Sequence, residues 1–336
     1  MDVVARDEDI AAAAERYRRF ADEEAPGRSD LYTGWGAQVA EDPALTAVVG
    51  RIPAAHRQPP LVFAVARLLG APEVVGARWR AWMLAHADEL AAACERRTVQ
   101  TNEPLRCAAL LPALAMIEGP IALLEVGASA GLCLYPDRYS YRYETPSGPV
   151  AIDPEAGPSA VVLHSRWDAV ARPPARLPDV VWRAGVDLAP LPPDAPGTRE
   201  WLTALVWPGE DGRAARIGRA LDIAASDPPV LVAADAASGA ITRLAAAAPA
   251  HATLVVSTPG VLVYLPRDAR VAVIAEARRV GRWLTLDQPA VHDGWRRHPV
   301  VPAGACALAL DGEVLASADP LGRFVEWRRG AGAPRG

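Results

Sequence analysis

The chain has 336 residues, 51% of them hydrophobic, and a formal net charge of −5, which suits one large domain or a large and a smaller one. The absence of any run of five basic residues disfavours nucleic-acid binding, and the absence of an 18-residue apolar run disfavours a membrane span. Four widely spaced cysteines and an acidic N-terminus predict free thiols in a cytoplasmic protein, without a disulfide framework or a metal site.

The first hundred residues carry a helical pattern. Asp9 to Ala25 is alanine-rich and ends at Pro26-Gly27, and Ser29 is placed to cap the next helix. A further long helix is predicted from Pro72 to Arg97. We therefore expect residues 1–100 to form a helical cap subdomain.

From Ile121 the pattern changes to strands that alternate with helices. Such alternation predicts an α/β fold with a doubly wound, Rossmann-like sheet over residues 101–330, and we expect antiparallel strands at its C-terminal end. Residues 145–227 are rich in Pro and Gly and are interpreted as an insertion. The predicted strands are Ala122–Val126, Tyr139–Glu144, Val230–Ala234, Thr253–Ser257, Trp283–Asp287, Cys306–Leu310, Val314–Ala316 and Arg323–Trp327; the helices of this part are 236–248 and 267–281.

The stretch Ile121-Ala-Leu-Leu-Glu-Val-Gly-Ala-Ser-Ala-Gly131 joins a buried strand to a small-residue loop, and a helix is expected to follow. Its glycines lie at offsets 0 and 4, whereas a dinucleotide loop needs 0, 2 and 5. The spacing resembles the Gly-x-Gly-x-Gly loop of S-adenosylmethionine-dependent methyltransferases, with Ser129 replacing the middle glycine. Glu125 matches the acidic residue that ends the first strand of those enzymes.

That resemblance implies a set of cofactor contacts. Glu125 and the loop would hold the amino-acid end and the ribose, Glu144 near the end of the second strand would accept the ribose hydroxyls, and Asp235 would contact the adenine. For Glu144 and Asp235, a solvated strand end and a helix N-cap are equally good interpretations. The predicted cofactor-binding residues are Thr101, Asn102, Glu125, Gly127, Ala128, Ser129, Gly131, Glu144 and Asp235.

The segment Thr101-Asn102-Glu103 precedes a proline in a first helical turn. The chain contains no lysine and Asn102 is its only asparagine, which a GC-rich coding bias would explain. Asn102 is then either an N-cap or a ligand contact through its amide. Arg106 could bind a carboxylate or form a surface ion pair, and Glu103 is the candidate general base, so these two are the predicted catalytic residues.

The same loop also spells Gly-x-Ser-x-Gly, the nucleophile elbow of α/β-hydrolases. Asp235 and His292 follow Ser129 in the required chain order. Against a hydrolase, helices rather than strands precede the loop, and Glu125 would lie beneath a developing oxyanion. The hydrolase is therefore the less favoured alternative.

Motifs along nearly the whole chain resemble a bacterial family, domain-of-unknown-function family 2332. The resemblance implies a methyltransferase-like central fold, and we expect an S-adenosylmethionine-dependent methyltransferase acting on an unknown small-molecule or other acceptor. A non-catalytic nucleotide or metabolite sensor is the alternative. The matching segments are Ser29-Asp-Leu-Tyr32, Gln100-Thr-Asn-Glu103, Arg106, Leu124–Leu132, Asp137-Arg-Tyr139, Arg183–Pro190, Trp201-Leu202, Val206-Trp-Pro208 and Gly322–Trp327.

Overall fold

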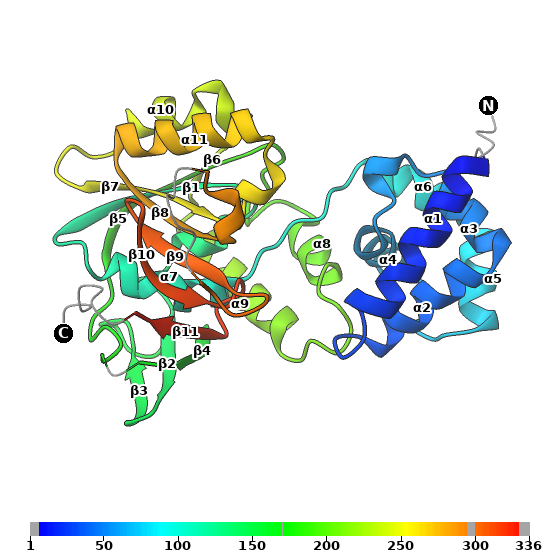
Figure 1. The fold of residues 1–336 in the computed structure, drawn as a ribbon, viewed down its shortest axis with the longest axis horizontal. Helices are drawn as coiled ribbons and strands as arrows, with labels where there is room; N and C mark the ends of the chain where they lie inside the picture. The colour runs from blue at the N-terminus through cyan, green and yellow to red at the C-terminus, as the bar shows by residue number, and fades with distance from the viewer. Residues whose placement is uncertain (1–6, 170, 294–299, 329–336) are drawn as a thin grey trace. The chain divides into compact units, whose positions relative to one another are not determined.

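The computed structural model describes residues 7–169, 171–293 and 300–328 and divides the chain into two units. The helical unit combines Met1–Thr101 with Pro196–Ala215, and the sheet unit combines Asn102–Ala195 with Arg216–Gly336 (Figure 1). The sequence places the first boundary at residue 100 but assigns residues 196–215 to an insertion instead of to the helical unit.

The helical unit is built from short, capped helices. Ser29 caps α2 as predicted, because its hydroxyl accepts a hydrogen bond from the Tyr32 N–H at 3.2 Å. The single helix predicted from Pro72 to Arg97 is wrong: the chain breaks at His86, whose ring nitrogen bonds the Trp82 carbonyl. The α-helices are α1 (Asp7–Arg19), α2 (Asp30–Glu41), α3 (Pro43–Gly50), α4 (Pro59–Leu68), α5 (Ala77–Ala85), α6 (Ala87–Glu95) and α8 (Thr198–Ala204), with a π-helical turn at Phe20–Glu24 and a 3₁₀ turn at Ala54–His56.

An aromatic cluster forms the core of this unit. Phe63 lies at its centre, and Trp207 comes from the second segment to contact Phe20 at a ring separation of 5.2 Å. Arg67 ties the same segment to α4 by donating to the Ala204 carbonyl at 3.0 Å. The rings that contact Phe63 are those of Tyr17, Phe20, Tyr32, Trp35 and Trp79.

The sheet unit contains a mixed 11-stranded sheet of order β3-β2-β4-β11-β10-β9-β8-β7-β1-β5-β6. Neighbours within β6-β5-β1-β7-β8 are all parallel, and β9 joins β8 in the antiparallel sense. The antiparallel C-terminal strands are confirmed. The strands are β1 (Pro120–Val126), β2 (Ser140–Thr145), β3 (Gly148–Ile152), β4 (Val162–Trp167), β5 (Asp179–Asp187), β6 (Val230–Ala233), β7 (Thr253–Pro259), β8 (Arg282–Asp287), β9 (Cys306–Leu310), β10 (Glu313–Ala318) and β11 (Phe324–Trp327).

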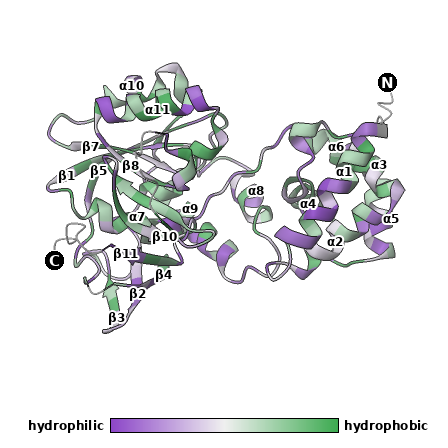
Figure 2. Ribbon diagram, in the orientation of Figure 1, coloured by the Kyte–Doolittle hydropathy of each residue, from purple (hydrophilic) through white to green (hydrophobic). Residues whose placement is uncertain are grey.

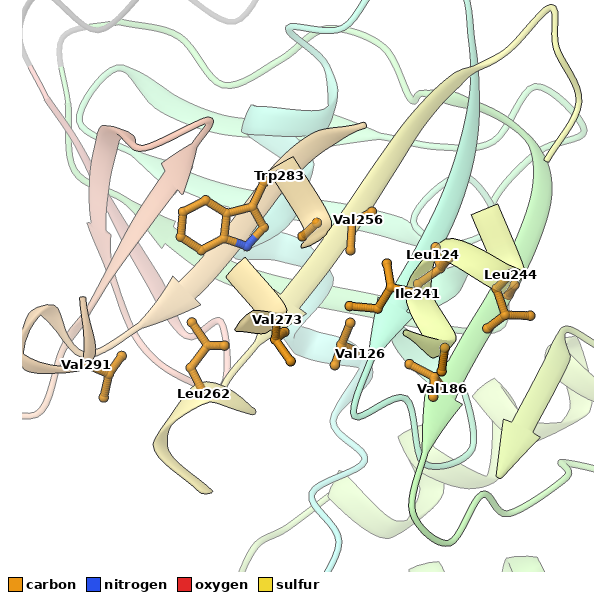
Figure 3. Packing of buried hydrophobic residues seen from close by; sticks show 13 residues of the cluster. Leu124, Val126, Val186, Ile241, Leu244, Val256, Leu262, Val273, Trp283 and Val291 are labelled. Carbon is orange, nitrogen blue, oxygen red and sulfur yellow. The ribbon is translucent and has the colours of Figure 1, made fainter. Parts of the chain in front are cut away.

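The helices α10 (Ala240–Ala245) and α11 (Arg267–Val280) pack on the parallel strands, and in Figure 1 both lie on the same side of the sheet. Figure 2 shows hydrophobic and hydrophilic residues on both ribbons, as expected of helices that cover a sheet with one face. Figure 3 shows the resulting core, in which Leu124 and Val126 of β1 lie with Val256 and Trp283 against Ile241 of α10. Because side chains alternate along a strand, Glu125 points to the other face.

The other helices of the sheet unit are α7 (Cys107–Leu114), which is buried throughout and packs against β4, β8 and β9, and α9 (Arg213–Ser226). The sheet unit also contains single 3₁₀ turns at Pro104–Arg106 (η3), Leu132–Leu134 (η4), Ala236–Ser238 (η5), Leu262–Tyr264 (η6) and Pro289–Val291 (η7).

Two predicted placements differ from the structure. The strand β2 occurs where expected along the chain, but β4, β11, β10, β9, β8 and β7 separate it from β1. The strand beside β1 is β5, which belongs to the segment interpreted as an insertion. That segment, residues 145–227, therefore contains regular structure and supplies the strands β3, β4 and β5 and the helices α8 and α9.

Candidate functional site

The candidate site lies at the carboxyl ends of the parallel strands. After β1, the chain adds β5 and β6 on one side of it and then returns to add β7 on the other side. Loops that leave neighbouring strands in opposite directions open a crevice at such a switch point, and ligands of α/β sheets bind there. Here the switch point falls between Glu125 and Ser257, which pair in register on β1 and β7.

Glu125 and Ser257 carry polar atoms that the described part of the protein leaves unsatisfied. Both residues are buried, and neither Glu125 Oε2 nor Ser257 Oγ has a hydrogen-bond partner there. On the other side Glu125 pairs with Gly185, which has no side chain to offer. A buried polar group without a partner costs free energy, so the pair is a place where a ligand's donor groups would be accommodated.

The electrostatics of Glu125 follow from this burial. Desolvation raises the pKa of the Glu125 carboxyl well above its usual range, and the neighbouring Cys133 raises it further. The positive charge of Arg106 offsets part of that shift. Burial therefore favours the protonated form of Glu125, and an approaching cation would favour the ionised form.

The glycine loop at residues 127–131 differs from its predicted form in two ways. No α-helix follows it, since only the three-residue turn η4 begins after Gly131. Its backbone N–H groups are also used within the protein, so they are not available to cradle a ligand. They donate from Gly127 and Ala128 to the Val186 carbonyl, from Ser129 to Asp187, from Ala130 to Asn102 and from Gly131 to the Ala128 carbonyl.

The loop glycines are required by the backbone and its packing. Gly127 has a φ of +73°, and a Cβ atom there would lie 2.6 Å from Val261 Cγ2. Gly131 has a φ of +70°, in the left-handed region that disfavours other residues. Ser129 also has a positive φ, of 51°. These positions are explained without a ligand, and Ala128 is buried over Gly185.

Asn102 proves to hold this loop. Its amide nitrogen donates to Ser129 Oγ at 2.6 Å, and its amide oxygen accepts from the Ala130 N–H at 3.0 Å. Neither prediction for Asn102 foresaw this, because the cap of η3 is Glu103 and the amide binds the protein itself. Only a side chain that both donates and accepts makes this bridge, which explains the lone asparagine of the chain.

Glu103 and Arg106 are likewise engaged within the protein. The Glu103 carboxylate accepts from Arg216 Nε at 2.8 Å and Nη2 at 3.2 Å, so the geometry favours a positioning role over a general base. Arg106 donates to the carbonyls of Pro259 and Pro320, and no carboxylate pairs with it in the described ranges. The alternative interpretation of Arg106, a surface ion pair, is therefore wrong, and Arg106 is buried. Thr101 is exposed and belongs to the helical unit.

The acidic residue beside β1 is Asp187, which the sequence prediction missed. It ends β5 and is half-buried, and its two carboxylate oxygens accept from the Ser129 N–H at 2.9 Å and the Ala189 N–H at 2.8 Å. Glu144, predicted for this position, is exposed on β2 and pairs in register with Pro149 at the far end of the sheet. The placement of Glu144 is wrong because local sequence does not reveal which strands pair.

Asp235 lies where predicted, directly after β6. It is exposed, and its carboxylate accepts from the Ala237 N–H at 2.8 Å, so it caps the turn η5. The acids at the ends of three adjacent strands thus follow the strand order: Asp235 after β6, Asp187 on β5 and Glu125 on β1.

The hydrolase triad does not assemble. Asp235 follows β6 and His292 follows β8, with β5, β1 and β7 between them. At about 4.8 Å per strand, four steps place these elements roughly 19 Å apart, too far for an acid to orient a histidine. Ser129 is also buried and its hydroxyl accepts from Asn102.

The family model described as an uncharacterized protein conserved in bacteria matches residues 14–327. The chain belongs to this family, domain-of-unknown-function family 2332. Comparisons with curated proteins and with solved structures found no match.

In residues 7–169, 171–293 and 300–328, no helix combines the length and apolar character needed to cross a bilayer. Over the same ranges, no three His, Cys, Asp or Glu side chains are grouped as a metal site would need.

Proposed function

We propose that the protein binds S-adenosylmethionine at the carboxyl ends of β1, β5 and β6 and transfers its methyl group to an acceptor. The observation that carries the proposal is the row of acids in strand order, Glu125, Asp187 and Asp235, beside the switch point. The parallel order β6-β5-β1-β7-β8, continued by the antiparallel β9, supports it, because methyltransferase sheets close with an antiparallel strand.

The residues present fit this cofactor. The unsatisfied Glu125 Oε2 and Ser257 Oγ are acceptors suited to a ligand ammonium group. Each oxygen of Asp187 accepts one protein hydrogen bond and retains a lone pair, which suits the two vicinal hydroxyls of a ribose. Asp235 is exposed at the next strand and would reach an exocyclic amine.

When bound, the cofactor supplies an electrophilic methyl on a sulfonium, and in-line displacement needs mainly that donor and acceptor be held together. The protein's own contribution begins with Glu125. A cationic ammonium group stabilises the ionised carboxylate, so binding expels the proton that burial retains there. Asn102 and Asp187 fix the loop over this group from two sides.

Ligand binding without chemistry is the second candidate function. It is favoured by one observation: the side chains of both predicted catalytic residues, Glu103 and Arg106, form hydrogen bonds within the protein itself. Incubation with labelled cofactor and a metabolite extract as the source of acceptors separates the two functions, since only an enzyme transfers the methyl group to an acceptor and releases S-adenosylhomocysteine.

Calorimetric titration with S-adenosylmethionine and S-adenosylhomocysteine tests the proposal. We expect Asp187→Asn to weaken binding about five- to 150-fold, the loss of one charged hydrogen-bond acceptor. Glu144→Gln is the matched control, because Glu144 lies on β2, which is not adjacent to β1, and its substitution should leave the affinity unchanged. Melting curves check that each variant is folded.

The same titration in buffers of different ionisation enthalpy counts the protons released. The wild-type protein should release a proton on binding either ligand, whereas Glu125→Gln should not. Methylthioadenosine, which lacks the ammonium group, should bind without release. A protein that binds NAD but neither sulfur ligand, or an equal loss in Asp187→Asn and Glu144→Gln, would overturn the proposal.

A further inference from the structure

Two of the four cysteines meet between α7 and η4. Cys107 begins α7 and Cys133 lies in the turn that follows the glycine loop. The Cys107 thiol donates to the Cys133 carbonyl at 3.6 Å, and the Cys133 thiol donates to the Glu103 carbonyl at the same distance. The first of these bonds brings the two cysteines together, although 26 residues separate them in the chain.

The two thiols are not equivalent. Cys107 is completely buried, whereas 7% of Cys133 is exposed. The neighbouring Cys107 thiol and the positive charge of Arg106 lower the pKa of Cys133. Burial raises the pKa of Cys107 above its usual range. Cys133 is therefore the better nucleophile of the pair, and Cys107 is placed as its partner.

The other cysteines lack this environment. Burial raises the pKa of Cys94 to about 12 and that of Cys306 to about 11. Cys306 also feels the charge of Arg106, but no thiol donates to it in the described part of the chain. A neighbouring arginine alone therefore does not activate a thiol here.

We infer that Cys107 and Cys133 form a redox-active pair that hydrogen peroxide converts to a reversible disulfide. The Cys133 thiolate attacks a peroxide oxygen, the O–O bond breaks, and the departing hydroxide takes up a proton, which leaves a sulfenic acid and water. The Cys107 sulfur then attacks the sulfenic sulfur and expels a second water. Two thiols and one peroxide thus yield one disulfide and two waters. The inference does not rest on the proposed function.

The disulfide would join the first residue of α7 to the turn after the glycine loop. Arg106 precedes Cys107 directly, so the bond would tie the chain at Arg106 to the segment that begins at Gly131. A reductant restores both thiols, since a disulfide exchanges with any accessible thiolate.

The experiment treats the full chain with hydrogen peroxide and follows the intact mass and the peptides released without reduction. We expect the loss of two hydrogens and a Cys107–Cys133 cross-linked peptide that disappears on adding dithiothreitol. In Cys107→Ser, the reaction should stop at a sulfenic acid that dimedone traps at Cys133. Oxidation at Cys133 should be at least about tenfold faster than at Cys94, since one pKa unit changes the thiolate fraction tenfold.

Cys94→Ser and Cys306→Ser are the matched controls, and both should form the cross-link as the wild type does. A melting curve shows whether each variant is folded. The comparison of oxidation rates at Cys133 and Cys94 uses the wild-type protein and does not depend on any variant. Equal oxidation of all four cysteines, a cross-link involving Cys94 or Cys306, or dimedone labelling of Cys107 in Cys133→Ser at the wild-type rate would each overturn the inference.

Discussion

The glycine loop at residues 127–131 follows Glu125 directly in the chain, and Glu125 pairs in register with Ser257, yet the polar groups of the loop and of this strand-end pair differ. Every N–H group of the loop donates to the protein. The strand-end pair keeps two buried oxygens without a partner in the described ranges. A conspicuous motif can therefore be structural, while the unsatisfied polar groups belong to less conspicuous residues beside it.

The largest expected effect tests whether the loop is architectural. Gly127→Ala places a Cβ atom 2.6 Å from Val261 Cγ2 on a left-handed backbone. We expect a loss of about 2–5 kcal/mol in the free energy of unfolding, from backbone strain and overpacking together. Urea denaturation measures it.

Gly119→Ala is the matched control for that variant. Gly119 has a similar φ of +75° but no atom within 4 Å of an added Cβ, so it reports strain alone. We expect it to lose only about 1–2 kcal/mol. Equal losses at the two positions would show that the contact with Val261 relaxes freely.

The second prediction concerns how the buried Glu125 carboxyl of the strand-end pair makes the free energy of unfolding depend on pH. Because burial raises the pKa of Glu125, the folded protein keeps a proton that the unfolded chain loses above its own pKa of about 4.3. Stability should therefore fall as the pH rises above that value, by about 1.4 kcal/mol per pH unit for each such group. Glu125→Gln should reduce the slope, and thermal melting from pH 4 to 8 measures it.

Asp287 at the end of β8 calibrates this experiment. Burial raises the pKa of Asp287 to about 7, so its own contribution to stability has the same sign and is lost between about pH 4 and pH 7. Asp287→Asn should remove that part of the slope, and the double variant should have the flattest profile. An unchanged slope in Glu125→Gln would mean that the carboxyl is ionised and solvated in the folded protein.

The smallest expected effect tests whether Asn102 holds the glycine loop in place. Asn102→Ala removes both hydrogen bonds to the loop and leaves the buried Ala130 N–H without its acceptor, at a cost of about 1–3 kcal/mol. Asn102→Asp keeps that acceptor and should lose less. Hydrogen exchange at Ala130 is the local measurement, with Thr101→Ala as the exposed control. Unaltered exchange in Asn102→Ala would contradict the bridge.

Local patterns were sufficient to predict much of the sheet. The strand that ends at Val126, the strands after residue 230 and the helix α11 occur where the periodicity places them, because burial on both faces of a parallel sheet leaves a continuous apolar signature. Glu125 could be predicted for the same reason, because it is a carboxylate inside such an apolar run. Asp235 followed from its position after an apolar strand.

What the patterns could not supply was strand pairing and side-chain partnership. Glu144 was assigned to the second strand because β2 comes next in the chain, whereas the register places β5 beside β1. The mostly apolar segment Val180–Val186, which Asp187 follows, was a usable signal that the surrounding prolines obscured. No spacing rule could have paired Asn102 with Ser129, since that contact depends on the three-dimensional path of the chain.

The two-segment composition of the helical unit has a consequence for synthesis. Phe20 and Tyr32 leave the ribosome early, but their partner Trp207 follows only after β1 to β5 have been made. The aromatic cluster therefore waits for its last ring while the strands of the other unit emerge, and such non-local closure slows folding. A fragment that ends at residue 101 would expose those rings to solvent. During synthesis the same rings are exposed until Trp207 emerges, so we expect the nascent chain to need chaperones.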